Sequence, residues 1–216
     1  MLLCAKRRTG RAFAQFIFLQ KTRWVIIAFE SEGVLVMEQI EHLIDNLITR
    51  EGGFVDHPAD KGGPTRWGIT QAVARRHGYV DQMDKLPRSV AASIYKRQFW
   101  RAPGFDQLAH IAPKLAGELF DTGVNMGTGT AIGFLQRTLN ALNRNGQDYH
   151  DISVDRKIGP ITLRTLEAFI EKRGPSAEGV LTKAIDALQG AYYLRLAEAC
   201  PAQEAFLYGW LANRIG

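Results

Sequence analysis

Glu51, Asp60 and Thr65 place two carboxyl groups and one hydroxyl group within a short stretch of the chain. Hydrolysis of a glycosidic bond needs a carboxylic acid beside the leaving oxygen. It also needs a group on the other side that positions water or stabilises the developing positive charge. Glu51 suits the first task and Asp60 the second, while the Thr65 hydroxyl could help to hold the water. This stretch is therefore a candidate catalytic site.

The residues on either side of Glu51 suggest how such an acid is positioned. Apolar residues recur at helical spacing from Met37 onward, which predicts a helix with one buried face that ends near Glu51. The recurring residues are Ile40, Leu43, Ile44, Leu47 and Ile48. A carboxyl that is partly withdrawn from water at a helix end holds its proton more readily. Glycines and prolines between Gly52 and Gly68 predict a loop or a short irregular β-hairpin, whose backbone a sugar could approach.

A glutamate before glycines is, in most proteins, only the end of a helix, so the longer pattern matters. The pattern consists of Glu51-Gly52-Gly53-Phe54-Val55, Pro58, Asp60, Gly62-Gly63, Thr65 and Trp67-Gly68-Ile69-Thr70. It resembles the signature of glycoside hydrolase family 108, a lysozyme-like N-acetylmuramidase family of phages, prophages and some secretion loci. It is also similar to the Glu, Asp and Thr pattern of phage lysozymes. There the second gap is one residue longer than the four residues between Asp60 and Thr65 here.

This resemblance implies a fold, a reaction and a set of roles. The fold would be mainly α and lysozyme-like (α+β), a helical bundle with a small irregular β-hairpin near residues 52–68. The reaction would be hydrolysis of the β-1,4 bond between N-acetylmuramic acid and N-acetylglucosamine. Glu51 would donate the proton, Asp60 would position water or stabilise charge, and Thr65 would help to hold that water. The resemblance implies no metal and no organic cofactor.

Three further residues are candidates for substrate binding. Trp67 offers an aromatic face on which a sugar ring could stack. Asp121 and Asn125 lie four residues apart and share one face of a predicted helix, where they either line the cleft or form a buried hydrogen-bonded pair. The family resemblance continues through Ile94-Tyr95-Lys96 and Phe99-Trp100, for which core packing is the favoured interpretation.

The pattern of apolar stripes and helix breakers divides the chain into three parts. Residues 1–36 form an N-terminal extension, 37–118 a lysozyme-like catalytic domain, and 119–216 a helical domain packed on it. From about Leu119 the chain resembles the predicted peptidoglycan-binding domain that commonly follows this catalytic domain. Helices are expected at Thr70–His77, from Ser89, at about Pro113–Asn125, after the Gly127-Thr128-Gly129 break, from Pro160, and at about 177–199 and 202–213.

The charge distribution argues against a nucleic-acid partner. The net charge is +5, but residues 1–36 alone carry six Lys and Arg against two Glu, leaving 21 basic and 20 acidic residues in 37–216. The main body is therefore nearly neutral. Cys4 and Cys200 lie at opposite ends of the chain and lack metal-ligand spacing, so neither a disulfide framework nor a zinc site is predicted.

Residues 1–36 allow two interpretations. Their apolar runs, Ala12–Leu19 and Trp24–Phe29, are too short to span a bilayer, and the first makes a poor signal peptide. The favoured hypothesis is that translation begins at Met37, because Glu32-Gly33 can be encoded by a purine-rich, ribosome-binding stretch. An export or anchor role is the alternative. N-terminal sequencing of the native protein would decide between them.

The biological expectation is a phage or prophage endolysin, made in the bacterial cytoplasm and acting in the periplasm and cell wall. Its partner would be the peptidoglycan glycan strand, which it would reach through a holin or an export system, and we expect a monomer. The alternative is a non-catalytic peptidoglycan-binding protein that assists secretion. Joint presence of Glu51, Asp60 and Thr65 favours the enzyme, because a binding protein needs no proton donor.

Overall fold

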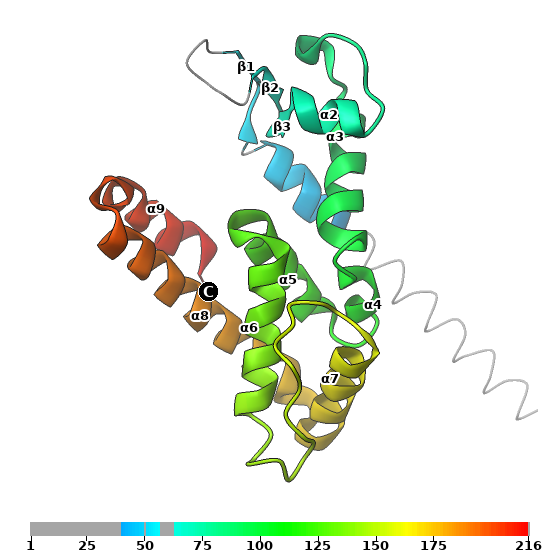
Figure 1. Ribbon diagram of the computed structural model, residues 1–216, viewed down its shortest axis with the longest axis vertical. Coiled ribbons are helices and arrows are strands. Elements are labelled where there is room, and N and C mark those ends of the chain that lie inside the picture. Colours follow the sequence, from blue (N-terminus) through cyan, green and yellow to red (C-terminus); the bar gives the residue numbers. More distant parts are fainter. Residues whose placement is uncertain (1–39, 50, 57–62, 216) are drawn as a thin grey trace, which may run out of the picture. The chain divides into compact units, whose positions relative to one another are not determined.

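The computed structural model describes residues 40–49, 51–56 and 63–215 of the chain. All of them lie in one compact unit that begins at Ile40. The unit is mainly α-helical and carries a small antiparallel sheet (Figure 1), which confirms the predicted fold class. Within these described ranges, none of the helices combines the length and the apolar character that crossing a membrane requires.

The first helix, at residues 40–49, has the single buried face that its apolar periodicity predicts. Ile40, Ile44, Leu47 and Ile48 are each at most 3% exposed. Leu43 lies at the edge of this face and contacts a later helix, because a Cβ added to Gly117 would come within 3.4 Å of the Leu43 Cδ1 atom. The burial of these side chains holds the helix against the rest of the fold.

Three two-residue strands follow the first helix. They are β1 (Phe54–Val55), β2 (Thr65–Arg66) and β3 (Ile69–Thr70), arranged in the order β1-β2-β3 with antiparallel pairing. The predicted hairpin is confirmed, and β3 adds a strand that the sequence did not indicate. Thr70 then caps α2 (Gln71–Arg76), because its Oγ1 atom accepts a hydrogen bond from the Val73 N–H at 3.4 Å.

The next segment contains the largest differences from the expected elements. After the short η1 (Met83–Lys85), α3 (Arg88–Tyr95) begins one residue before Ser89, with no side-chain cap. It continues directly into a π-helical segment, η2 (Lys96–Arg101), and a short α4 (Phe105–Ala109) follows. Trp100 is buried and makes edge-on ring contacts with Phe105 and Phe120. The π-helical segment thus carries Trp100 into the core.

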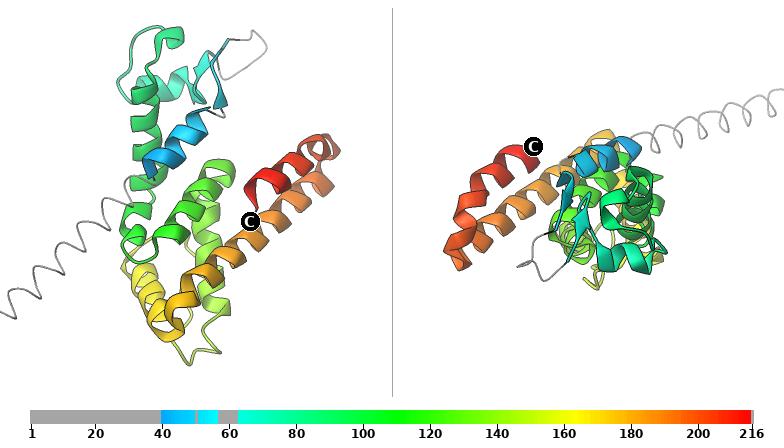
Figure 2. Two further views of the ribbon diagram at one scale, coloured as in Figure 1. Left: turned by 180° about the vertical axis from the view of Figure 1, so that it is seen from behind. Right: turned by 90° about the horizontal axis from the view of Figure 1, so that it is seen from above.

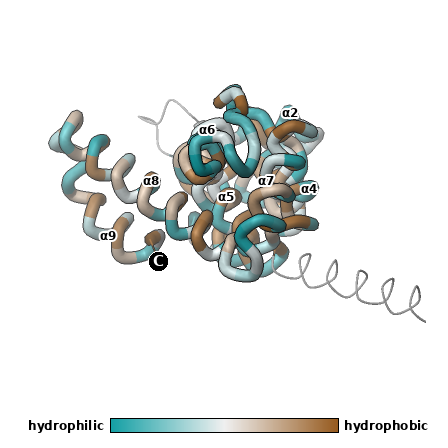
Figure 3. The backbone as a smooth tube through the Cα atoms, turned by 90° about the horizontal axis from the view of Figure 1, so that it is seen from below, coloured by the Kyte–Doolittle hydropathy of each residue, from teal (hydrophilic) through white to brown (hydrophobic). Residues whose placement is uncertain are grey.

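The remaining helices agree with the predicted bounds to within a few residues. Their ranges are α5 (Pro113–Met126), α6 (Thr128–Ala141), α7 (Pro160–Arg173), α8 (Ala177–Ala199) and α9 (Glu204–Arg214), with single 3-10 turns at η3 (Gly174–Ser176) and η4 (Pro201–Gln203). Helix α5 packs against α6 and α8. Helices α8 and α9 lie side by side in both views of Figure 2. Both helices mix apolar and polar residues (Figure 3), but only α8 has a buried face, since the described residues of α9 are exposed or half-buried.

A buried glutamine fixes the loop between α6 and α7. The Gln136 side chain donates to Asp155 Oδ1 at 2.7 Å and to the Lys157 carbonyl at 3.1 Å, and accepts from the Arg156 N–H at 2.9 Å. The hydrogen bond from Gln136 also holds the pKa of the Asp155 carboxyl below its ordinary value. Asp155 therefore has a structural role in the turn before α7.

Candidate active site

Glu51 lies at the C-terminal end of the first helix, and the residue is exposed. Gly52 follows with φ +78°, a left-handed conformation that turns the chain away from the helix axis. The expected position at a helix end is therefore confirmed. The residue as a whole is exposed while its stem packs beside Gly68, so the expected partial withdrawal of the carboxyl from water stays a prediction.

The stem of Glu51 contacts the turn between β2 and β3. A Cβ added to Gly68 would lie 3.0 Å from Glu51 Cγ and 3.2 Å from Glu51 Cβ. The same Cβ would lie 2.4 Å from the Tyr95 hydroxyl oxygen. Burial raises the pKa of the Tyr95 hydroxyl, and the negative charge of Glu51 raises it further. The side chains of Glu51 and Tyr95 thus both lie against Gly68, although the three residues come from separate parts of the chain.

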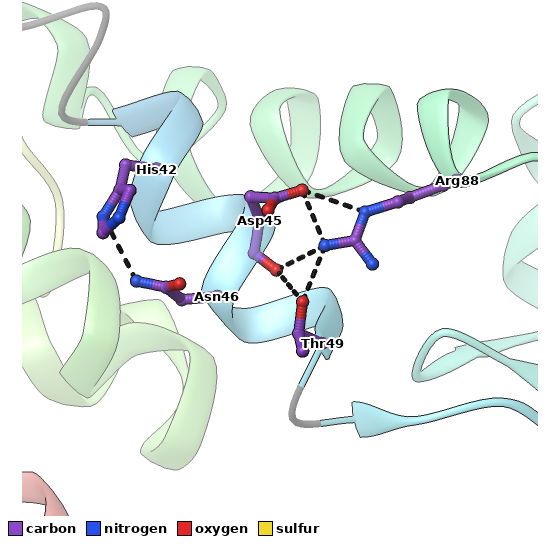
Figure 4. A network of polar contacts seen from close by, with 5 residues as sticks. All are labelled: His42, Asp45, Asn46, Thr49 and Arg88. Carbon is purple, nitrogen blue, oxygen red and sulfur yellow. Dashed lines mark hydrogen bonds and ion pairs between the residues drawn. The ribbon is translucent and has the colours of Figure 1, made fainter.

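Arg88, the first residue of α3, forms hydrogen bonds with the helix that carries Glu51 (Figure 4). Arg88 donates from Nε and Nη2 to Asp45 Oδ1 at 2.9 and 2.6 Å, from Nη2 to the Asp45 carbonyl at 2.7 Å, and to Thr49 Oγ1 at 2.7 Å. A second ion pair, Lys96 with Glu41, joins the first helix to η2, the direct continuation of α3. The planar guanidinium can serve several acceptors at once, so it fixes the last turn before Glu51.

Replacing this arginine should weaken the attachment. Arg88→Lys is expected to lower the free energy of unfolding by about 1 kcal/mol, because an ammonium group cannot match all these acceptors. Partial exposure of Arg88 and Asp45 keeps the effect small. Chemical denaturation measures it, with Arg137→Lys at an exposed position of α6 as the control. Equal losses in the two variants would contradict the proposed attachment.

The other two predicted catalytic residues have different outcomes. Thr65 is half-buried in β2, and its hydroxyl donates to the Gly63 carbonyl at 3.2 Å, a contact within its own hairpin that does not involve Glu51. Asp60 belongs to residues 57–62, which lie outside the described residues. Their roles in positioning water therefore stay predictions.

Trp67, predicted to bind substrate, has clear structural contacts. Its indole N–H donates to the Leu86 carbonyl at 3.0 Å. The guanidinium carbons of Arg66 and Arg88 lie 5.1 and 5.6 Å from the ring centroid, within the range of cation–π interaction. The ring therefore links the hairpin to the start of α3, and its predicted contact with a sugar stays a prediction.

Asp121 and Asn125 lie together on α5, as their spacing predicts. The Asn125 amide donates to Asp121 Oδ2 at 3.0 Å and to the Asp121 carbonyl at 2.8 Å. Both residues are half-buried. The hydrogen-bonded pair, one of the two alternatives for these residues, is present, and their contact with substrate stays a prediction.

A hollow of about 620 Å³ lies beside the sheet, between β1 and the segment from α2 to η1. Polar and apolar residues both line it, among them Phe54, Asp56, Arg75, Asp81 and Asp84, but not Glu51. The Arg75 guanidinium is already bonded to the carbonyls of Tyr79 and Asp81. The hollow therefore does not define the candidate centre. No cluster of His, Cys, Asp and Glu suited to a metal ion occurs among the described residues.

Sequence reasoning missed the contacts that two residues, Tyr95 and Arg88, make near the candidate acid. Tyr95 was assigned to core packing, and its burial, at 4% exposure, agrees with that assignment. Its hydroxyl nevertheless donates to the Trp67 carbonyl at 3.1 Å, close to Glu51. Arg88 gave no signal, because its acceptors lie about forty positions earlier in the chain. The unusual Trp-Gly pair before Ile69 was the one local sign of a constrained turn.

The fold is mainly α-helical, with an exposed glutamate at the end of its first helix, a small antiparallel sheet and a further set of helices after α5. Residues 44–127 match the family model of glycosyl hydrolase 108, and residues 130–215 match that of a predicted peptidoglycan domain. The chain therefore contains a glycosyl hydrolase 108 domain followed by a predicted peptidoglycan domain, which confirms the resemblance. It is a peptidoglycan-related hydrolase.

The structure is also similar to a solved structure described as that of Brucella abortus SagA. The two share 21% sequence identity with a TM-score of 0.54, and the match covers 82% of this chain and 89% of the other. This likeness supports the fold. No curated protein matches the chain significantly. The division at residues 118 and 119 stays a prediction.

Proposed function

We propose that this protein is an N-acetylmuramidase that hydrolyses the β-1,4 bond between N-acetylmuramic acid and N-acetylglucosamine in peptidoglycan. The observation that carries the proposal is the position of Glu51. It lies on a fixed helix end, open to a large substrate, within the part that matches glycosyl hydrolase 108. Glu51 would protonate the leaving oxygen, after which the bond to that oxygen breaks and water adds to the sugar carbon.

Asp60 would act on the opposite face of the sugar, either through water or by stabilising the oxocarbenium-like transition state. Thr65, on β2, would help to orient the water. Carboxyl groups about 6.5–9.5 Å apart would make the enzyme inverting, and a separation of about 5–5.5 Å would make it retaining. Trp67, Asp121 and Asn125 are the proposed sugar contacts. Residues 130–215 would hold the insoluble polymer near the site and raise its effective concentration.

The test is digestion of purified sacculi by the full-length protein, followed by mass spectrometry of the soluble fragments. Reduction of the released fragments with borohydride after the digestion marks the new reducing ends. A muramidase gives fragments with N-acetylmuramic acid at the reducing end. Fragments with N-acetylglucosamine at the reducing end would show that the enzyme cleaves the other glycosidic bond of the glycan strand, which would contradict the proposal. Fragments cut only in the peptide would overturn glycosidase activity.

A second candidate is a protein that binds peptidoglycan without cutting it and assists secretion. The match of residues 130–215 to a predicted peptidoglycan domain is the observation that favours it. Sedimentation with intact sacculi separates the two functions. Binding without release of soluble fragments would support this second candidate.

For the biological setting we propose a phage or prophage endolysin that is made in the bacterial cytoplasm. It would reach the wall through a holin or an export system and act there as a monomer. Expression in the cytoplasm should then lyse cells only after the membrane is permeabilised. Lysis without permeabilisation would contradict the dependence on a separate release system.

A further inference from the structure

The turn between β2 and β3 has an unusual backbone. The register pairs Thr65 with Thr70 and Arg66 with Ile69, which leaves a two-residue turn. Both turn residues have positive φ, 55° at Trp67 and 71° at Gly68. Glycine adopts this conformation readily, whereas a bulky tryptophan does so at a cost. Such strain persists only where surrounding contacts hold it.

Two hydrogen bonds hold the strained residue in place. The Trp67 indole donates to the Leu86 carbonyl at 3.0 Å, which fixes the side chain. The Tyr95 hydroxyl donates to the Trp67 carbonyl at 3.1 Å, which fixes the peptide group that leads into Gly68. Burial and the negative charge of Glu51 both raise the pKa of the Tyr95 hydroxyl, so this donor keeps its proton throughout the neutral range.

Gly68 differs from other glycines with positive φ in what surrounds it. A Cβ on Gly63 or Gly78 would meet nothing within 4 Å. A Cβ on Gly68 would meet the Tyr95 hydroxyl oxygen and the Cγ and Cβ atoms of Glu51, all within 3.2 Å. The backbone of Gly68 thus packs directly against the stem of Glu51, and only a residue without a side chain fits there.

We propose that Tyr95 and Gly68 are positioning residues for Glu51. Tyr95 holds the Trp67-Gly68 turn through the Trp67 carbonyl, and the turn supports the stem of Glu51 so that its carboxyl keeps one direction. An exposed carboxyl on a flexible stem would otherwise sample several rotamers, few of which reach the leaving oxygen. The inference rests on the proposed role of Glu51 as the general acid.

Gly68→Ala tests the contact. It should lower kcat on peptidoglycan by about 100-fold, because a displacement of the acid by about 1 Å has an effect of that size. The half-saturating peptidoglycan concentration should change less than about twofold, since binding of the polymer does not depend on the Glu51 rotamer. Gly78→Ala is the matched control, with the same backbone strain in open space. Equal losses of kcat in the two variants would overturn the inference.

Tyr95→Phe provides a second variant in case Gly68→Ala does not fold. Loss of the hydroxyl should lower kcat by about tenfold, again without a change in half-saturation. The double variant should be more active than the product of the two single losses, because the closest clash of the new Cβ is with the hydroxyl that Tyr95→Phe removes. Independent, multiplying losses would contradict the proposed coupling.

The outcomes separate this inference from the proposed function. A wild-type protein that releases no sugar fragments would overturn the proposed function and, with it, the positioning of an acid. An active wild-type protein whose Tyr95→Phe and Gly68→Ala variants keep full kcat would overturn the positioning role alone. Thermal unfolding of the four proteins in the cycle reports the packing of the turn separately from activity.

Discussion

Glu51→Gln is expected to lower the rate of reducing-end release from purified peptidoglycan by about 100- to 10,000-fold. Glutamine has nearly the shape of glutamic acid but cannot donate a proton to the leaving oxygen. The residue is exposed at a helix end, so the substitution should leave the core intact. Reducing-sugar assays measure the loss, and thermal unfolding verifies the fold.

Glu167→Gln, at an exposed position of α7, is the matched control and should keep wild-type activity. The Glu51→Gln protein should still sediment with sacculi, because the carboxyl acts in the transition state and contributes little to holding the polymer. Full activity of a folded Glu51→Gln protein would contradict the assignment of the general acid. Loss of sedimentation as well would indicate that Glu51 has a role in binding.

The helices could be predicted from the sequence wherever their signals are local. The range of α8 was expected at 177–199 and is found at Ala177–Ala199, because Gly174-Pro175 precedes it and Pro201 follows it. Its buried residues recur every fourth position, and this spacing is visible in the sequence. The first helix and α7 were predictable for the same reason, since an apolar stripe and helix-breaking residues define each of them.

The elements between Arg88 and Ala109 were less predictable, because distant residues determine them. The π-helical segment places Trp100 against Phe105 and Phe120, with ring centroids 6.4 and 6.2 Å apart. No local periodicity indicates a widened turn of this kind. The strand β3 was missed because two residues are too few to show an alternating pattern.

In the candidate site, too, the features with local sequence signals were predictable and those that depend on tertiary contacts were not. Glu51 was found from its motif, and its position at a helix end followed from the apolar stripe before it. The support of its stem depends on Tyr95, which lies 28 positions from the Trp67 carbonyl that it binds. Such a contact is fixed by tertiary packing and leaves no local pattern. A helix stripe shows which face is buried but not how far the end of the helix is covered, so the surroundings of the Glu51 carboxyl could not be predicted from it.

The second large effect concerns a carboxyl pair between α5 and α8. Glu118 on α5 and Asp186 on α8 are close enough to interact, and a hydrogen bond between two carboxyl groups requires a proton on one of them. Burial, followed by the negative charges of Asp186 and Asp121, raises the pKa of Glu118 to about 8, and a hydrogen bond from Thr122 opposes this only in part. One oxygen of Asp186 is buried without a hydrogen-bond partner among the described contacts. A proton held by Glu118 therefore favours the α5–α8 contact at neutral pH.

The direction of the pH dependence follows from this raised pKa. Between the ordinary value of 4.5 and about 8, folded Glu118 keeps a proton that the unfolded chain has lost. The free energy of unfolding contributed by this group is therefore greatest below pH 4.5, falls as the pH rises toward about 8, and stays constant above that. Glu118→Gln should remove this slope and make the protein more stable at pH 8, by about 1–2 kcal/mol after allowance for partial solvent screening.

Glutamine retains the contacts on which this comparison depends. Its amide can donate to the Asp186 carboxylate, and its carbonyl can accept from Thr122, so the α5–α8 contact no longer needs a titratable proton. Urea denaturation at pH 5, 6.5 and 8 should give diverging stabilities for the wild type and Glu118→Gln. Glu167→Gln should follow the wild type at each pH, because that position is exposed. Parallel pH dependences for the wild type and Glu118→Gln would show that α5 and α8 share no proton.

Helix α5 lies in the segment matched to glycosyl hydrolase 108, and α8 lies in the segment matched to the predicted peptidoglycan domain. A confirmed slope would therefore mean that alkaline pH weakens the contact between these two segments.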